Sequence, residues 1–173
     1  MGGTCDYGLF YSKESNLSLA SFSGSDWAGN TDNRKSTTGG CFYVGANLVA
    51  WMSKKQNSMS LSTAEVEYIA AGSYFSQLLW MKKVLTDYGI SQDTMVVYCD
   101  NSSAIDISKN PVQNSKTKHI KIRYHFIRDL VKRKIVCLEY IPNECQNADT
   151  FTKPLDRSKF ETLRQVIGVI LCP

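Results

Sequence analysis

A short apolar run that ends in an acid constrains the fold of this chain more than any other feature. The run covers residues 95–99, Met-Val-Val-Tyr-Cys, and Asp100 follows it directly. Such a run is typical of a strand buried on both faces, in a sheet flanked by helices. The carboxyl ends of such strands form the edge at which open α/β sheets bind ligands. Asp100 is therefore a candidate site residue, although an acid here also fits a turn before a helix capped by Asn101 or Ser102.

The composition is that of one globular domain with a sizeable core, because 43% of the 173 residues are hydrophobic and 21% are charged. No apolar run approaches the roughly 20 residues that cross a bilayer, and no signal peptide is recognisable, so we expect no membrane partner. The formal net charge of +4 does not by itself predict nucleic-acid binding. The six cysteines show no C-x-x-C pair and no zinc spacing. We expect reduced thiols and an intracellular, non-secreted protein.

The expected elements follow one another as three strands, a helix, a strand, two helices, a strand and a last helix. Residues 1–16 are polar and Gly-rich and are predicted to be a linker, with the folded domain at 17–173. Period-two patterns and turn residues predict strands at 17–26, 40–44, 48–52, 95–99 and 135–141. Helical periodicity and capping residues predict helices at 62–88, 102–110, 119–134 and 158–167. This order predicts an α/β fold with a five-stranded mixed sheet, three antiparallel strands followed by parallel ones, flanked by helices.

One acid lies on the apolar face of the first expected helix. At about 100° per residue, a single stripe contains Glu67 together with Ala71, Tyr74, Leu78, Met81 and Leu85. Glu65 falls on nearly the opposite side. A buried acid is costly unless something pairs with it. A metal ion is one such partner, and a structural ion pair or exposure at a frayed helix end is the alternative.

Four acids thus lie near the edges of expected elements: Asp26, Glu67, Asp100 and Asp149. Carboxylates that converge are tolerated when they hold hard cations such as Mg²⁺ or Mn²⁺. Two ions about 3.5–4 Å apart can activate a water and stabilise the leaving oxygen of a phosphodiester. That chemistry needs no covalent nucleophile. It also agrees with the absence of a Ser-His-Asp or Cys-His set, since both histidines fall on one expected helix.

The order of elements and acids resembles ribonuclease H. More narrowly, the motifs are similar to the ribonuclease H domain that closes the Pol polyprotein of copia-type LTR retrotransposons. The similar stretches cover nearly the whole chain and include Ser25-Asp-Trp-Ala-Gly29, Arg34-Lys-Ser-Thr-Thr-Gly39, Ser53-Lys-Lys-Gln56, Leu61-Ser-Thr-Ala-Glu-Val-Glu-Tyr-Ile-Ala70, Tyr98-Cys-Asp-Asn101, Lys109-Asn-Pro111, Thr117-Lys-His-Ile120, Arg123-Tyr-His-Phe126 and Ala148-Asp-Thr-Phe-Thr-Lys-Pro-Leu155. Thr4 and the stretch Asp6-Tyr-Gly-Leu9 resemble the junction that follows the polymerase part of such polyproteins.

The resemblance implies a metal-dependent endonuclease that cleaves the RNA strand of RNA–DNA hybrids during reverse transcription and leaves a 3′ hydroxyl. It implies two Mg²⁺ ions, with Mn²⁺ as a substitute, bound by Asp26, Glu67, Asp100 and Asp149. Glu67 matches the family's helix glutamate because E-x-x-A begins there, so the resemblance and the apolar stripe select the same residue. The implied partners are the hybrid and a polymerase domain of the same polyprotein. We expect a monomeric domain in a cytoplasmic particle or the nucleus.

Two departures from the family pattern set the alternatives. Relatives commonly carry two acids in the first motif, and the earlier position is Gly24 here. Cellular and retroviral enzymes also carry a histidine in the loop before the last aspartate. The corresponding loop here, residues 143–147, has none, and copia-type relatives share this departure. The glycine keeps open a catalytically silent domain that only binds nucleic acid or has a structural role. A transposase or integrase on the same fold is a third interpretation, which the aspartate at position 149 disfavours.

A hybrid duplex would be held through phosphate and 2′-hydroxyl contacts. The expected binding residues are Arg34, Lys54, Lys55, Gln56, Asn57, Lys116, Lys118 and His119. Each of them alone fits an ordinary surface residue equally well. Asn147 is a further candidate, as a residue that helps to place Asp149.

Overall fold

The computed structural model describes residues 5–13, 15–27, 29, 35–56, 62–109 and 118–172, with the backbone alone for 118–124. Five strands form one mixed sheet in the spatial order β4-β3-β2-β5-β6. These strands are β2 (Leu19–Asp26), β3 (Thr37–Val44), β4 (Asn47–Lys55), β5 (Met95–Cys99) and β6 (Val136–Tyr140). β2, β3 and β4 are antiparallel neighbours, and β5 runs parallel to both β2 and β6. The predicted α/β fold with a five-stranded mixed sheet is confirmed.

The apolar run at residues 95–99 is an interior strand, as its composition predicts. β5 lies between β2 and β6, while β2 is the middle strand of the sheet. Met95, Val97 and Cys99 point into the main core and are almost fully buried, whereas Val96 and Tyr98 are only partly buried on the opposite face.

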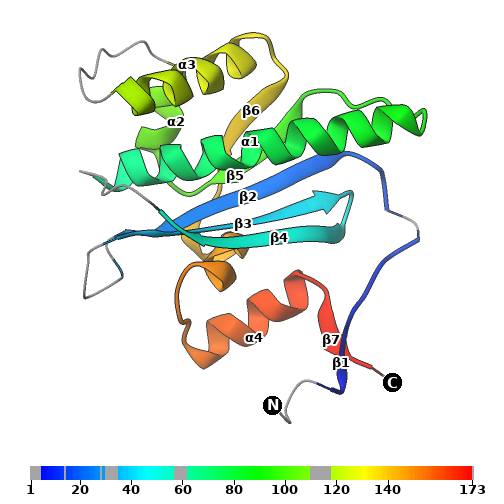
Figure 1. Ribbon diagram of the computed structural model, residues 1–173. Coiled ribbons are helices and arrows are strands. Elements are labelled where there is room, and N and C mark those ends of the chain that lie inside the picture. The colour runs from blue at the N-terminus through cyan, green and yellow to red at the C-terminus, as the bar shows by residue number, and fades with distance from the viewer. Residues whose placement is uncertain are drawn as a thin grey trace.

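Helices cover both faces of the sheet (Figure 1). α1 (Thr63–Asp87), α2 (Ser102–Lys109) and α3 (Lys118–Lys132) lie on one face, and α4 (Arg157–Val166) lies on the other with η1 (Asn143–Cys145) and η2 (Asn147–Phe151). The larger core is under α1, where Phe42, Tyr74 and Leu78 are almost fully buried. A second, smaller core lies on the α4 side of the sheet and includes Tyr43 and Ile167.

α1 forms where capping and periodicity predict it. The Ser62 side chain accepts a hydrogen bond from the Glu65 backbone N–H, and the chain leaves the helix through Gly89 at a φ of +77°. The predicted stripe is confirmed over most of its length, because Glu67, Ala71, Tyr74, Leu78 and Met81 are all buried, while Leu85 at its end is partly buried against the same core. The helix therefore presses one acid against the sheet along with its apolar residues.

The two ends of the described chain meet in a separate two-stranded ribbon. β1 (Tyr7–Leu9) pairs antiparallel with β7 (Val169–Leu171), and the Arg164 guanidinium lies 4.5 Å from the centre of the Tyr7 ring. The segment predicted to be a linker, 1–16, thus contains a strand. Its partner β7 was not predicted, because three residues are too few to show a period.

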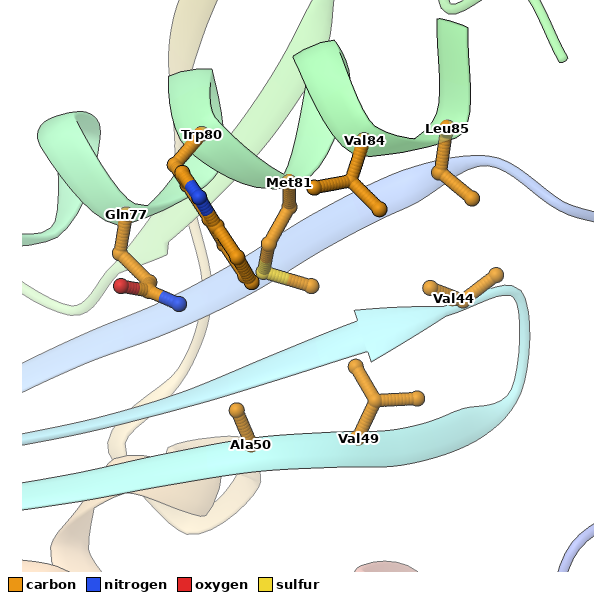
Figure 2. A pocket seen from close by; sticks show the side chains of 8 residues that line it. All are labelled: Val44, Val49, Ala50, Gln77, Trp80, Met81, Val84 and Leu85. Carbon is orange, nitrogen blue, oxygen red and sulfur yellow. The ribbon is translucent and has the colours of Figure 1, made fainter. Parts of the chain in front are cut away.

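An apolar groove of about 230 Å³ separates the C-terminal half of α1 from the β3–β4 hairpin. Figure 2 shows Val44, Val49 and Ala50 of the hairpin opposite Trp80, Met81, Val84 and Leu85 of the helix. Among the described residues that line it, the polar groups are the Gln77 amide and the Trp80 indole N–H, and none is ionisable. Among the described helices, none is long and apolar enough to cross a membrane.

Candidate metal centre

Glu67 is a buried acid with one oxygen satisfied and one not. Its side chain reaches β2, where Oε1 accepts hydrogen bonds from the Ser25 backbone N–H at 2.8 Å and the Ser25 hydroxyl at 2.6 Å. The residue is 6% exposed. Oε2 has no hydrogen-bond partner among the described residues. A buried carboxylate oxygen without a donor is costly, and a bound cation would satisfy it.

The environment of Glu67 favours its protonated form when no cation is present. The pKa of Glu67 is raised from 4.5 to about 8, chiefly by burial and to a smaller extent by the charges of Asp100 and Asp149. The two hydrogen bonds from Ser25 act in the opposite direction. The influence of both aspartates on this pKa also shows that the three carboxylates lie within electrostatic reach of one another.

Asp100 lies beside Glu67 at the carboxyl end of β5. One ligand atom from each of Glu67, Cys99 and Asp100 lies within 4.8 Å of the others. Asp100 Oδ2 accepts a hydrogen bond from Asn143 Nδ2 at 3.2 Å. Burial raises the pKa of the Cys99 thiol to about 12, and sulfur is a soft ligand that suits a hard cation poorly. The two carboxylates are the useful donors of this group.

Asp149 lies on η2, where two ammonium groups engage it. Lys153 Nζ is 3.1 Å from its Oδ1, and Lys159 Nζ is 2.7 Å from its Oδ2. Lys159 also donates to Asn143, at 3.0 Å to Oδ1 and 3.2 Å to the backbone oxygen. Asn143 and Lys159 therefore connect Asp100 to Asp149.

Buried amides hold η2 against the sheet and so position Asp149. The Gln146 amide donates to the Ser23 carbonyl at 3.0 Å, and its oxygen accepts from the Ala148 N–H at 3.3 Å. Asn147, expected to help place Asp149, donates from Nδ2 to the Tyr43 hydroxyl at 3.1 Å. It thus acts on Asp149 indirectly, by anchoring η2 to β3.

Asp26 is not a member of the 4.8 Å group that Glu67 and Asp100 form with Cys99. In the parallel pairing of β2 with β5, Ala20 is opposite Val96 and Phe22 is opposite Tyr98. Continuing that register places Gly24 level with Asp100, and Asp26 two residues beyond it. The Asp26 carboxylate instead covers Gly29, where an added β-carbon would collide with it. The geometry therefore assigns the place beside Asp100 to position 24, where this chain has no side chain.

Of the eight expected hybrid-binding residues, the structure describes the side chains of three. Lys54 and Lys55 are exposed at the end of β4, as a phosphate contact requires. Gln56 is buried, because its amide donates to Thr38 Oγ1 at 2.9 Å and to the Val66 carbonyl at 3.3 Å. Gln56 thus ties β3 to α1, and we drop it as a phosphate contact. The other expected contacts lie outside the described side chains: Arg34, Asn57, Lys116, Lys118 and His119.

The arrangement fits a divalent cation between Glu67 and Asp100, on the strength of the buried Glu67 Oε2 that lacks a donor.

Sequence reasoning did not find Ser25, Asn143, Lys153 and Lys159, which orient or neutralise the acids. The spacing of Lys153, four residues after Asp149, was a visible signal. Nothing in the sequence marks Lys159, because its contact depends on how α4 packs against η2.

The chain is similar over its whole length to parts of plant retrotransposon polyproteins. It is 41% identical over 174 residues to the retrovirus-related Pol polyprotein from transposon RE2 of Arabidopsis thaliana, which accounts for 100% of this chain. It is 41% identical over 151 residues, or 87% of this chain, to the Pol polyprotein from transposon TNT 1-94 of Nicotiana tabacum. The chain spans only 12% and 11% of the lengths of these two relatives. No protein-family model matches the chain.

Solved structures share its fold at low sequence identity. The N-terminal RNase H domain of a Mycobacterium tuberculosis protein matches with a TM-score of 0.54 at 12% identity, over 87% of this chain and 98% of that one. LC11-RNase H1, solved with an RNA/DNA hybrid, matches with a TM-score of 0.56 at 13% identity, over 78% and 93%. A foamy viral protease-reverse transcriptase, also solved with a hybrid, matches with a TM-score of 0.52 at 13% identity, over 86% of this chain and 20% of that one. At these identities the likeness establishes the fold.

Proposed function

We propose that this chain is a metal-dependent endonuclease acting on the RNA strand of RNA–DNA hybrids. The premise is that it belongs with the ribonuclease H-like segments of copia-type retrotransposon Pol polyproteins. The observation that carries the proposal is Glu67, a buried acid that shares a 4.8 Å group with Asp100 and keeps one oxygen without a donor. A purely structural acid at this depth would be expected to have both oxygens satisfied.

Glu67 and Asp100 would hold Mg²⁺, or Mn²⁺ in its place. A bound ion of this kind supplies Lewis-acid activation of a water and stabilisation of the leaving oxygen. The chain's own residues orient the site. Ser25 fixes Glu67 through two hydrogen bonds, and Asn143 fixes Asp100. Asp149 adds a third negative charge close by.

The substrate proposal rests on the chemistry around this centre and on the relatives. Lys54 and Lys55 are exposed on β4 and offer cations to a phosphate backbone without reading bases. The LC11 and foamy viral proteins were solved with RNA/DNA hybrids, which is the class of duplex that we propose for this chain. We also propose that the hybrid is delivered by a polymerase part of a longer polyprotein, since the relatives extend far beyond the matched segment.

The direct test compares Asp100→Asn with Asp106→Asn on a labelled RNA–DNA hybrid in Mg²⁺. Asp106 is an exposed residue of α2 and makes the matched control. We expect the parent and Asp106→Asn to cleave the RNA strand but not double-stranded DNA, and Asp100→Asn to lose most of the activity. Equal cleavage by both variants would contradict the proposed role of Asp100.

A second candidate function is a silent hybrid-binding domain, and Gly24 is the observation that favours it. The strand register places Gly24 level with Asp100, so the acid next to Asp100 is missing. A β-carbon at position 24 would lie 3.3 Å from the Ala148 β-carbon, which leaves little room for an added aspartate. Loss of one ligand would weaken metal binding and slow cleavage without preventing the fold.

Three variants separate the active and silent alternatives in the same cleavage assay: Asp26→Asn, Gly24→Asp, and Gly24→Asp combined with Ala148→Gly. The combined variant removes the crowding β-carbon of Ala148. An active parent that is unaffected by Asp26→Asn would show that Glu67, Asp100 and Asp149 suffice. An inactive parent that either Gly24→Asp variant activates would establish the silent alternative. Loss of activity in Asp26→Asn alone would contradict the register argument and restore Asp26 as a ligand.

A further inference from the structure

We propose that the Lys159 ammonium is a built-in cation at Asp149, so that the centre takes one divalent ion, between Glu67 and Asp100, rather than two. The inference rests on the proposed metal dependence and specifies its stoichiometry. It starts from Asp149, whose side chain is 3% exposed and has both oxygens engaged by lysines.

Lys159 is held in a way that an ordinary surface lysine is not. An ammonium has three N–H donors. Here they have three acceptors within hydrogen-bond distance, namely Asp149 Oδ2 at 2.7 Å, Asn143 Oδ1 at 3.0 Å and the Asn143 carbonyl at 3.2 Å. The Lys159 side chain is 23% exposed, against 34% for Lys153, which contacts Asp149 Oδ1 at 3.1 Å. The Lys159 ammonium thus has an oxygen acceptor for each of its three N–H groups, two of them from Asn143 and one from Asp149.

The charge balance of the centre favours one divalent ion. When all its groups are ionised, the centre carries one net negative charge. Three carboxylates (Glu67, Asp100 and Asp149) face two ammonium groups (Lys153 and Lys159). A family site with a further acid at position 24 would carry one more negative charge, but Gly24 supplies none. Two divalent ions would bring four positive charges into this environment. Repulsion between cations a few ångströms apart is strong where water is scarce.

Among the described residues, the one buried carboxylate oxygen without a donor belongs to the half of the centre that Lys159 does not contact. Glu67 Oε2 is buried and unsatisfied, and it belongs to the group with Asp100. Asn143 bridges the two halves, because its Nδ2 donates to Asp100 while its oxygens accept from Lys159. The geometry therefore offers a divalent ion the Glu67–Asp100 half and leaves the Asp149 half to the ammonium.

The test is a calorimetric titration of the full chain with Mn²⁺ and no nucleic acid, supported by anomalous diffraction from Mn²⁺-soaked crystals. Lys159→Met removes the ammonium and keeps the length of the side chain, and Lys159→Arg keeps a positive charge. Lys82→Met is the matched control, because the Lys82 ammonium also donates to a backbone carbonyl, that of Gln92 at 2.9 Å, but near the far end of α1. Thermal melts show which variants remain folded.

We expect one bound Mn²⁺ in the parent, in Lys159→Arg and in Lys82→Met, and two in Lys159→Met. The single anomalous peak of the parent should lie between Glu67 and Asp100. Two ions in the parent, or only one in folded Lys159→Met, would overturn the inference while leaving the proposed function standing. If Lys159→Met does not fold, the other proteins decide. Two ions bound to Lys159→Arg would overturn the inference, whereas a single anomalous peak in the parent, with Asp149 still in contact with Lys159, would support it. No Mn²⁺ bound to the parent would overturn both proposals.

Discussion

Replacing Glu67 with glutamine should make the metal-free protein more stable at high pH, although it removes a candidate ligand. The pKa of Glu67 is raised from 4.5 to about 8, chiefly by burial. Between these two pH values the folded state binds a proton that the unfolded state has lost. The free energy of unfolding of the parent therefore falls as pH rises through this window. Above pH 8 the folded state carries a buried charge that glutamine does not have.

The size of the effect follows from the width of that window. One pKa unit corresponds to about 1.4 kcal/mol, so the shift from 4.5 to about 8 corresponds to roughly 5 kcal/mol once Glu67 is fully ionised. Glutamine keeps an oxygen for the two Ser25 hydrogen bonds, but it buries an NH₂ group where Oε2 lacks a partner, at a cost of about 1–3 kcal/mol. That cost does not depend on pH. The diagnostic quantity is therefore the change in the stability difference between pH 4.5 and pH 9.

Urea unfolding with EDTA at pH 4.5, 7 and 9 measures this quantity for the parent, Glu67→Gln and Glu65→Gln. Glu65 lies on the same helix and is only half-buried, so it controls for the loss of a carboxylate from α1. We expect Glu67→Gln to gain roughly 5 kcal/mol on the parent across this pH range, and Glu65→Gln to follow the parent. A change below about 1 kcal/mol, less than one pKa unit, would refute the argument that Glu67 is buried without a counter-charge. Mn²⁺ at pH 9 should then stabilise the parent more than the variant.

Three further outcomes follow from the structure. Glu67→Gln should abolish hybrid cleavage in Mg²⁺ while Glu65→Gln retains it, and the reverse order of damage in the cleavage assay would contradict the assignment of the helix ligand. Lys55→Ala should reduce the slope of log affinity against log salt by about one unit in hybrid-binding titrations. An equal change in Lys83→Ala, an exposed lysine in the C-terminal half of α1, would show a non-specific charge effect. Gln146→Ala should lower the free energy of unfolding, measured in urea, by about 2–3 kcal/mol, because it leaves the Ser23 carbonyl and the Ala148 N–H without their partner. An unchanged midpoint of urea unfolding would contradict the role of Gln146 in holding η2 against the sheet.

The elements that sequence reasoning located are those with a clear period or cap. α1 shows both, and its buried stripe identifies Glu67 as the acid that faces the sheet. β5 is recognisable from its continuous apolar run, which also places Asp100 at a sheet edge. Local pattern carries these predictions because one buried face, repeated over several residues, leaves few alternatives.

What the sequence could not show depends on register and on side-chain reach. Asp26 and Gly24 lie two residues apart on the same face of β2, so only the pairing with β5 shows which of them is level with Asp100. Gln56 reads as a surface amide next to two exposed lysines, yet it turns inward to Thr38 and Val66. Such choices are made by neighbours that are distant in the chain. The roles of Asp26, Asp100, Asp149 and Glu67 in metal binding and catalysis stay predictions.

The ribbon of β1 and β7 has a practical consequence for anyone who shortens this protein. β7 pairs with no described strand other than β1, and Ile170 and Leu171 are already 41% and 60% exposed. A version trimmed to begin at residue 17, the boundary that composition suggests, would leave the backbone of β7 open beside these apolar side chains. An open edge of this kind is a template for strands from other molecules, so the trimmed protein should aggregate where the longer one does not. Residues 7–9, in a segment whose composition suggests a linker, thus protect the backbone edge of β7 from other molecules.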